Sequence, residues 1–241
     1  MKQGDALELH PAESAEKGQE LRYERKFLLP AASRHWVEAW LKVHPAAFRE
    51  PYPARHVNSL YFDSPDGQAY RDAVDGAPAR RKVRIRWYGD LFGDIDSARL
   101  EVKLKRGYLG RKLAWPVAPF RMDQGFDRNR LARALAASAL PQAVRIGLCG
   151  LELAVMSRYR RKYLESARNR CRVTVDSELE FWRVREWVNP FVCRATKRET
   201  VIVEIKYPPE RDRDARGLLD FLPLRLTKSS KFVQGLEELA L

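Results

Sequence analysis

Short segments in which charged and apolar side chains alternate run through most of the chain. In Lys82–Trp87, Lys or Arg occupies every second position, and Val, Ile or Trp occupies the positions between them. A period of two predicts a β-strand with one ionic face and one apolar face. Three cations on one face repel one another unless solvent or an anion relieves the repulsion.

The same alternation recurs along the chain, which predicts a sheet-rich protein. Gly107 and Gly110 bracket a turn between two of the segments and predict a hairpin there. Pro116 places the second of these segments at a sheet edge or at the end of its strand. The predicted strands are Leu21–Leu29, Val57–Asp63, Lys82–Trp87, Arg99–Lys105, Arg111–Val117, Leu153–Leu164, Cys171–Asp176 and Thr200–Tyr207.

Apolar stripes at helical spacing predict helices between the strands. Ser33 and Asp127 are suited to cap two of them, because their side-chain oxygens accept hydrogen bonds from the first free amide groups. The predicted helices are 31–43, 68–74, 127–140, 213–221 and 231–239. Residues 1–19 are polar and lack periodicity, so we expect a disordered leader before one folded domain over residues 20–241.

Composition narrows the function classes. The 241 residues carry a formal charge of +13 and are 45% apolar, which predicts a sizeable core and a polyanionic partner. Nucleic acid, an anionic membrane and a phosphate-rich small molecule all fit that charge. The three cysteines and four histidines show no disulfide or metal-ligand spacing. No apolar run approaches roughly 18 residues and no signal peptide is visible, so we expect a cytoplasmic protein without a transmembrane segment.

Two arrangements fit the alternating faces. In the first, the apolar faces form a central core and the ionic faces meet water, as is usual in small antiparallel proteins. In the second, the sheet closes into a barrel with the ionic faces inside and with helices on its apolar outside. Three features favour the second: the ionic faces carry both signs of charge, the helices have bulky apolar stripes that need a sheet surface to cover, and arginine is abundant.

An ionic lumen of this kind supports a narrow range of chemistry. Converging cations neutralise a linear polyphosphate, and a few carboxylates can hold Mg²⁺ or Mn²⁺, which bridge phosphate oxygens. Phosphoryl transfer depends mainly on such positioning and charge neutralisation.

Seven short motifs stand in a fixed order over residues 20–240. They are Tyr23–Lys26, Val83–Arg86, Leu100–Lys103, Tyr159 with Arg161, Arg172–Asp176, Val203–Lys206 and Ser230–Phe232. In this order the sequence resembles the VTC domain, the catalytic domain of the vacuolar transporter chaperone polyphosphate polymerase and a member of the triphosphate tunnel metalloenzyme superfamily. The resemblance implies an α+β fold: an eight-stranded antiparallel closed β-barrel, or tunnel, with an ionic lumen and flanking helices.

The resemblance also implies an activity and roles for individual residues. Members of the family make polyphosphate from the terminal phosphate of ATP with a divalent metal, Mn²⁺ or Mg²⁺. Glu204 resembles the metal-binding glutamate, and Asp176 is expected to pair with and orient an arginine. The implied catalytic residues are Arg84, Arg86, Lys103 and Glu204. The implied phosphate-binding residues are Lys26, Arg84, Arg86, Lys103, Lys112, Arg161, Arg172, Lys206 and Lys231.

One departure distinguishes branches of the superfamily. The first motif of the superfamily contains two glutamates followed by a lysine, and in this sequence Arg22 stands at the position of the first glutamate. This substitution favours the VTC branch over simple triphosphatases.

Three functions stay open. The first is a polyphosphate polymerase that uses ATP, and the second is a metal-dependent hydrolase of triphosphate or polyphosphate at the same site. The third is a non-catalytic binder of polyphosphate or nucleic acid, which we rank last because no specific nucleic-acid-binding motif is visible. Export of a product across a membrane would require a separate membrane partner.

Overall fold

The computed structural model describes residues 23–106, 109–166, 171–212, 226–227 and 229–240. The predicted leader over residues 1–19 and the predicted helix over 213–221 lie outside the described residues. Among those described, no helix combines the length and apolar character needed to cross a membrane.

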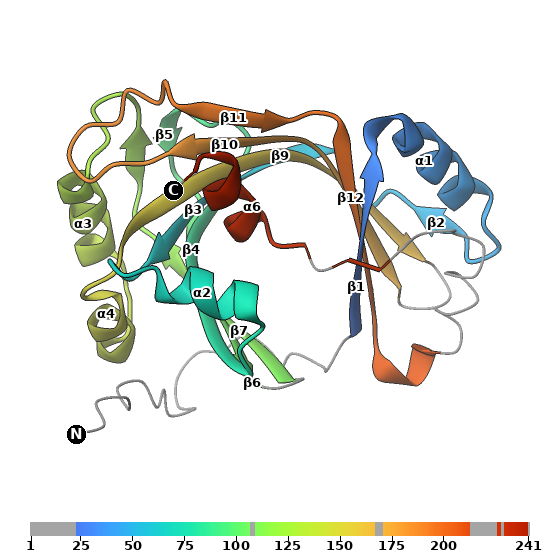
Figure 1. The fold of residues 1–241 in the computed structure, drawn as a ribbon, viewed down its shortest axis with the longest axis horizontal. Helices are drawn as coiled ribbons and strands as arrows, with labels where there is room; N and C mark the ends of the chain where they lie inside the picture. Colours follow the sequence, from blue (N-terminus) through green and yellow to red (C-terminus); the bar gives the residue numbers. More distant parts are fainter. Residues whose placement is uncertain (1–22, 107–108, 167–170, 213–225, 228, 241) are drawn as a thin grey trace.

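A long antiparallel sheet forms the centre of the molecule and curves into an arch (Figure 1). Its main path runs in the order β1-β12-β10-β9-β3-β4-β6-β7, and each pair of neighbours is antiparallel. These eight strands are Tyr23–Pro30 (β1), Thr200–Tyr207 (β12), Arg172–Arg183 (β10), Glu152–Ser166 (β9), Arg55–Asp63 (β3), Ala79–Tyr88 (β4), Ala98–Arg106 (β6) and Leu109–Val117 (β7).

The expected closed barrel is wrong in two respects. Within the described ranges the backbones of β1 and β7 do not pair, so the sheet stays open. It also has ten strands, because two short strands, Phe48–Arg49 (β2) and Arg194–Lys197 (β11), pair outside the main path. A separate two-stranded sheet joins Gly93–Ile95 (β5) to Phe120–Met122 (β8). The proline at position 116 lies on β7, a terminal strand, where its missing amide costs no ladder bond.

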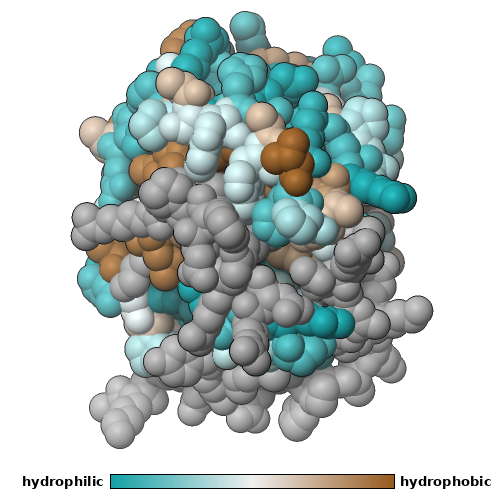
Figure 2. All heavy atoms as spheres, turned by 90° about the vertical axis from the view of Figure 1, so that its right-hand side faces the viewer, coloured by the Kyte–Doolittle hydropathy of each residue, from teal (hydrophilic) through white to brown (hydrophobic). Residues whose placement is uncertain are grey.

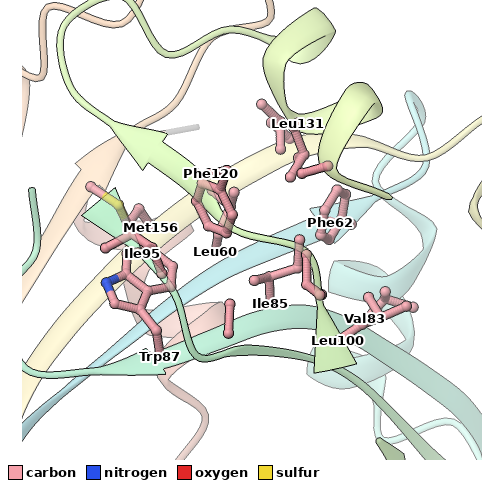
Figure 3. Packing of buried hydrophobic residues seen from close by; sticks show 14 of the residues in the cluster. Leu60, Phe62, Val83, Ile85, Trp87, Ile95, Leu100, Phe120, Leu131 and Met156 are labelled. Atoms are coloured by element: carbon pink, nitrogen blue, oxygen red, sulfur yellow. The ribbon is translucent and has the colours of Figure 1, made fainter. Parts of the chain in front are cut away.

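Three helices cover the convex side of the arch. Arg34–Val43 (α1), which follows the short 3₁₀ turn Ala31–Ser33 (η1), packs against β1, β10 and β12 through Val37 and Leu41. Arg128–Ala137 (α3) and Gln142–Leu148 (α4) pack over the other half, and Figure 3 shows Leu131 of α3 beside Leu60, Phe62 and Phe120. Figure 2 shows the face on the right-hand side of Figure 1, where polar side chains predominate among the coloured residues and apolar residues form small patches.

Of the two predicted helix caps, one makes the expected side-chain hydrogen bond and the other does not. Asp127 caps α3 as expected, since its Oδ1 accepts a hydrogen bond from the amide of Arg130 at 2.7 Å. Ser33 occupies the N-cap of α1 but makes no side-chain cap hydrogen bond. Two further elements are Gln68–Asp75 (α2), whose Ala69 and Tyr70 pack against the apolar cluster that contains Phe232, and the 3₁₀ turn Pro209–Arg211 (η2).

The C-terminal helix, Lys231–Glu238 (α6), lies inside the arch (Figure 1). Its Phe232 and Leu236 join an apolar cluster with side chains from β3, β9, β10 and β12. Gly235 faces this cluster so closely that a Cβ would lie 2.8 Å from Phe181 Cδ1 and 2.9 Å from Val155 Cγ2. The concave side of the sheet is therefore partly apolar, and α6 covers that part.

Candidate functional site

Charged side chains fill the rest of the concave side, because the alternation of each strand turns its ionic face inward. They gather around four carboxylates, each shared by at least two cations. We call this group the ionic cluster. Its members are Glu24, Lys26, Lys82, Arg84, Arg86, Glu101, Lys103, Lys112, Arg161, Asp176, Glu204, Lys206 and Lys231.

Glu101 on β6 anchors one end of the ionic cluster. Arg84 contacts its Oε2 through Nη2 at 2.6 Å and through Nε at 2.8 Å. Arg86 lies 3.8 Å from the same oxygen, and Lys112 lies 2.5 Å from Oε1. Burial opposes ionisation of Glu101, but the charges of Arg84, Arg86 and Lys112 outweigh it and lower its pKa to about 2.

Glu24 and Glu204 hold the lysines at the opposite end of the sheet. Lys26 Nζ lies 2.9 Å from Glu24 and 3.6 Å from Glu204, and Lys206 pairs with Glu204. Lys103 on β6 reaches Glu24 on β1 at 3.6 Å, so an ion pair spans the two ends of the open sheet. Burial raises the pKa of Glu24, but the charge of Lys26 outweighs burial with the help of the other lysines, and the resulting pKa is about 2. The charges of Lys26 and Lys206 likewise hold the pKa of Glu204 well below its usual value, although burial opposes them.

Asp176 on β10 is fully buried and serves two cations. Arg161 donates from Nε and Nη2 at 2.6 and 2.7 Å, and Lys231 of α6 lies 2.6 Å away. The expectation that Asp176 pairs with and orients an arginine is confirmed. Because Lys231 is the first residue of α6, this carboxylate also ties α6 to the sheet.

Two tyrosine hydroxyls support the arginines of β4. Tyr61 Oη accepts from Arg84 Nη1 at 3.3 Å, and Tyr159 Oη accepts from Arg86 Nη2 at 3.3 Å. Burial raises the pKa of Tyr61, but Arg84 and Arg86 lower it further, to about 8. The sequence gave neither hydroxyl a partner, although Tyr159 belongs to one of the family motifs, because the sequence of a strand does not reveal which distant side chain a hydroxyl will contact.

Lys82 belongs to the ionic cluster, although the sequence did not lead us to predict it as a site residue. Its Nζ donates to Ser230 Oγ at 2.9 Å, at the start of α6. Burial lowers its pKa to about 8, and the nearby charges of Lys26 and Lys103 act in the same direction. The signal was present, since Lys82 shares a strand face with Arg84 and Arg86.

Arg172 is the one predicted phosphate-binding residue that the structure does not bring into the ionic cluster. It lies on the same face of β10 as Asp176, but its guanidinium pairs with Glu165 at 2.7 Å and its side chain is 44% exposed. The other predicted residues all converge: Lys26, Arg84, Arg86, Lys103, Lys112, Arg161, Glu204, Lys206 and Lys231.

A divalent metal would find few protein ligands here. In the part of the chain that the structure describes, no three Asp, Glu, His or Cys side chains come together as a metal site. Glu204 and Glu24 lie close enough for each charge to affect the other's ionisation, and Mg²⁺ is commonly held by one or two carboxylates together with phosphate oxygens. The donor set therefore fits a metal that a bound phosphate helps to coordinate.

The fold is shared with solved structures of low sequence identity. HpAC1 from Hippeastrum, named for a proposed adenylyl cyclase activity and described as having a dominant triphosphatase activity, is 16% identical. The match covers 87% of this chain and 92% of that one, with a TM-score of 0.51. A proposed adenylate cyclase from Bacillus halodurans is 13% identical over 89% of this chain and 96% of that one, also with a TM-score of 0.51. These likenesses concern the fold.

The comparison with family models is more specific. The comparison with curated proteins gives no match. The model of the VTC domain matches residues 21–240, which is nearly the whole chain and includes every member of the ionic cluster. The chain therefore belongs to the VTC domain family, within the triphosphate tunnel fold.

Proposed function

We propose that the protein is a polyphosphate polymerase that transfers the terminal phosphate of ATP to a polyphosphate chain at the ionic cluster. The observation that supports this is the balance of charge. The cluster holds nine cations and four carboxylates among the described residues, so positive charges exceed negative ones by five. Such an excess, held by several strands, suits an extended anion with many oxygens.

The arginines and lysines would bind and orient the phosphates. Arg84, Arg86 and Arg161 present planar donor groups that are already held in place by carboxylates and by tyrosine hydroxyls. A terminal oxygen of the polyphosphate chain attacks the γ-phosphorus, a new P–O bond forms, and the bond to the β-phosphate oxygen breaks to release ADP. Cations placed around the transferring group stabilise its charge in the transition state.

Glu204, with Glu24 beside it, would hold Mn²⁺ or Mg²⁺ together with phosphate oxygens. When bound, the metal supplies further neutralisation of the phosphate charge. Lys26 and Lys206 pair with Glu204 in the free protein, so they would be released toward the phosphates when the carboxylate takes a metal.

The first prediction tests this function directly. Incubation with ATP and Mn²⁺ should yield polyphosphate that is resolved as a ladder of long chains on a gel. Glu204→Gln should lower the rate on the order of a hundredfold or more, because the isosteric amide cannot ligate the metal as a carboxylate does. Glu186→Gln, which alters a carboxylate paired with Arg128 on the outside, should leave the rate unchanged.

The products separate the proposal from its alternatives. Inorganic phosphate or short fragments without chain growth would indicate a polyphosphate hydrolase or a triphosphatase, of which only the triphosphatase activity is described for HpAC1. Binding of tripolyphosphate without any turnover, and with the same affinity in Glu204→Gln, would indicate a non-catalytic polyphosphate-binding protein.

A further inference from the structure

Three tyrosine rings surround one guanidinium at an end of the sheet next to the ionic cluster. The Arg55 guanidinium lies 4.0 Å from the ring centroid of Tyr88, 4.7 Å from that of Tyr52 and 5.3 Å from that of Tyr163. The rings of Tyr52 and Tyr163 meet edge to face at 4.7 Å. We call these four residues the tyrosine collar.

The tyrosine collar adjoins the phosphate-binding cations. Tyr88 follows Arg86 on the same face of β4, two positions and therefore about 7 Å further along the strand. Arg55 pairs in register with Arg161 across β3 and β9, and the Arg161 guanidinium lies 5.6 Å from the Tyr163 ring. The tyrosine collar and the ionic cluster are therefore neighbours on the concave side of the sheet.

The outer part of the tyrosine collar is open to solvent. Tyr88 is 40% exposed and Arg55 is also exposed, although Tyr163 beneath them is buried. The three rings hold the guanidinium by cation–π contacts, so the arginine and the exposed Tyr88 are positioned before any ligand binds. A planar aromatic ligand can stack on such a surface, and stacking is tolerant of base identity because every base has a π-face.

We infer that the tyrosine collar is a stacking subsite for the base of a nucleoside triphosphate whose phosphates contact the ionic cluster. This inference rests on the proposed function, because the phosphates must reach the ionic cluster. It adds a means by which the protein holds a nucleotide in addition to an inorganic phosphate chain. Since the contact is made by faces of rings, adenine and guanine nucleotides should bind with similar affinity.

The test compares two ligands with and without a base. Calorimetry in EDTA, which prevents metal-dependent turnover, measures the affinity for tripolyphosphate and for the β,γ-imido analogue of ATP. Tyr88→Ala should weaken binding of the ATP analogue about tenfold and leave tripolyphosphate affinity unchanged, because only the analogue has a base to stack. Tyr52→Ala, on a different segment, should shift the same ratio in the same direction.

Tyr23→Ala is the matched control. Tyr23 is a half-exposed tyrosine whose ring lies 5.7 Å from that of Tyr207, but its side chain lies on the other face of β1 from Glu24. Its removal should change neither affinity. Equal losses for both ligands in Tyr88→Ala, or no loss for either, would overturn the stacking subsite while the phosphate site stands. Failure of the unaltered protein to bind tripolyphosphate would overturn the proposed function and, with it, this inference.

Discussion

Each cation of the ionic cluster already has a partner, and this decides what substitution of a single residue should do. Arg84, for example, contacts both Glu101 and Tyr61. Phosphate oxygens would compete with these groups for the same guanidinium. The residue types that bind phosphate were evident from alternation and from the family motifs. Their partners were not, because pairs such as Lys103 with Glu24 join strands that lie far apart in the sequence.

The second prediction concerns Arg84. Arg84→Ala should weaken tripolyphosphate binding by about 1.5–3 kcal/mol, the usual value of a hydrogen bond to a charged group. Part of that loss would come from Glu101, which would keep Arg86 and Lys112 but would have one cation fewer. Calorimetry measures the affinity. Arg128→Ala removes an arginine that pairs with Glu186 on the outside and should change nothing; an unaltered affinity in Arg84→Ala as well would place Arg84 outside the site.

Among the elements, α6 is the one that joins the apolar and ionic parts of the interior. Its position was expected only as a terminal helix over 231–239, and the structure places it within the arch at Lys231–Glu238. The longer strands were predictable because six or more alternating residues give a clear period. Strands β2, β5, β8 and β11 were missed, since segments of two to four residues are too short to show one.

The third prediction tests the close packing of α6. Gly235→Ala should lower the free energy of unfolding by about 1–3 kcal/mol, because the new methyl group would overlap Phe181 and Val155. The higher helix propensity of alanine offsets part of this. Urea denaturation measures the change. Glu237→Ala, at an exposed position of the same helix, should stay within about 0.5 kcal/mol of the unaltered protein; a similar value for Gly235→Ala would show that the helix can move away from β9 and β10.

At the scale of the whole molecule, ion pairs connect the ends of the open arch. The family resemblance implied a closed barrel, and the local pattern could not reveal that β1 and β7 do not pair, because pairing between distant strands depends on how far the sheet curls. The inward orientation of the ionic faces was predictable from the mixture of charges. The ion pair between Lys103 and Glu24 bridges this opening, where the described backbones of β1 and β7 are not joined by hydrogen bonds.

The fourth prediction follows from the low pKa values of Glu24 and Glu101. Both are depressed to about 2 in the folded protein from an ordinary value of 4.5, so the unfolded chain takes up protons first as the pH falls. The stability that these groups contribute is present above pH 4.5 and is lost progressively as the pH falls toward 2. Urea denaturation at pH 7, 5 and 3 measures this loss.

Glu101→Gln is the variant that isolates one of the two groups. It should be less stable at pH 7 but lose less stability between pH 5 and pH 3 than the unaltered protein, because its amide does not titrate. Identical losses in the two proteins over this interval would contradict the assigned role of Glu101.

Lys231 and Phe232 are adjacent in sequence yet meet opposite surroundings, the first at a buried carboxylate and the second beside the ring of Tyr61. Successive residues of an α-helix point about 100° apart. A shift of α6 by one position would therefore move the ammonium group of Lys231 into the apolar cluster and the ring of Phe232 toward the carboxylate of Asp176. A change of register would therefore lose an ion pair and an apolar contact together, so the two adjacent side chains define a single rotation of α6 about its axis.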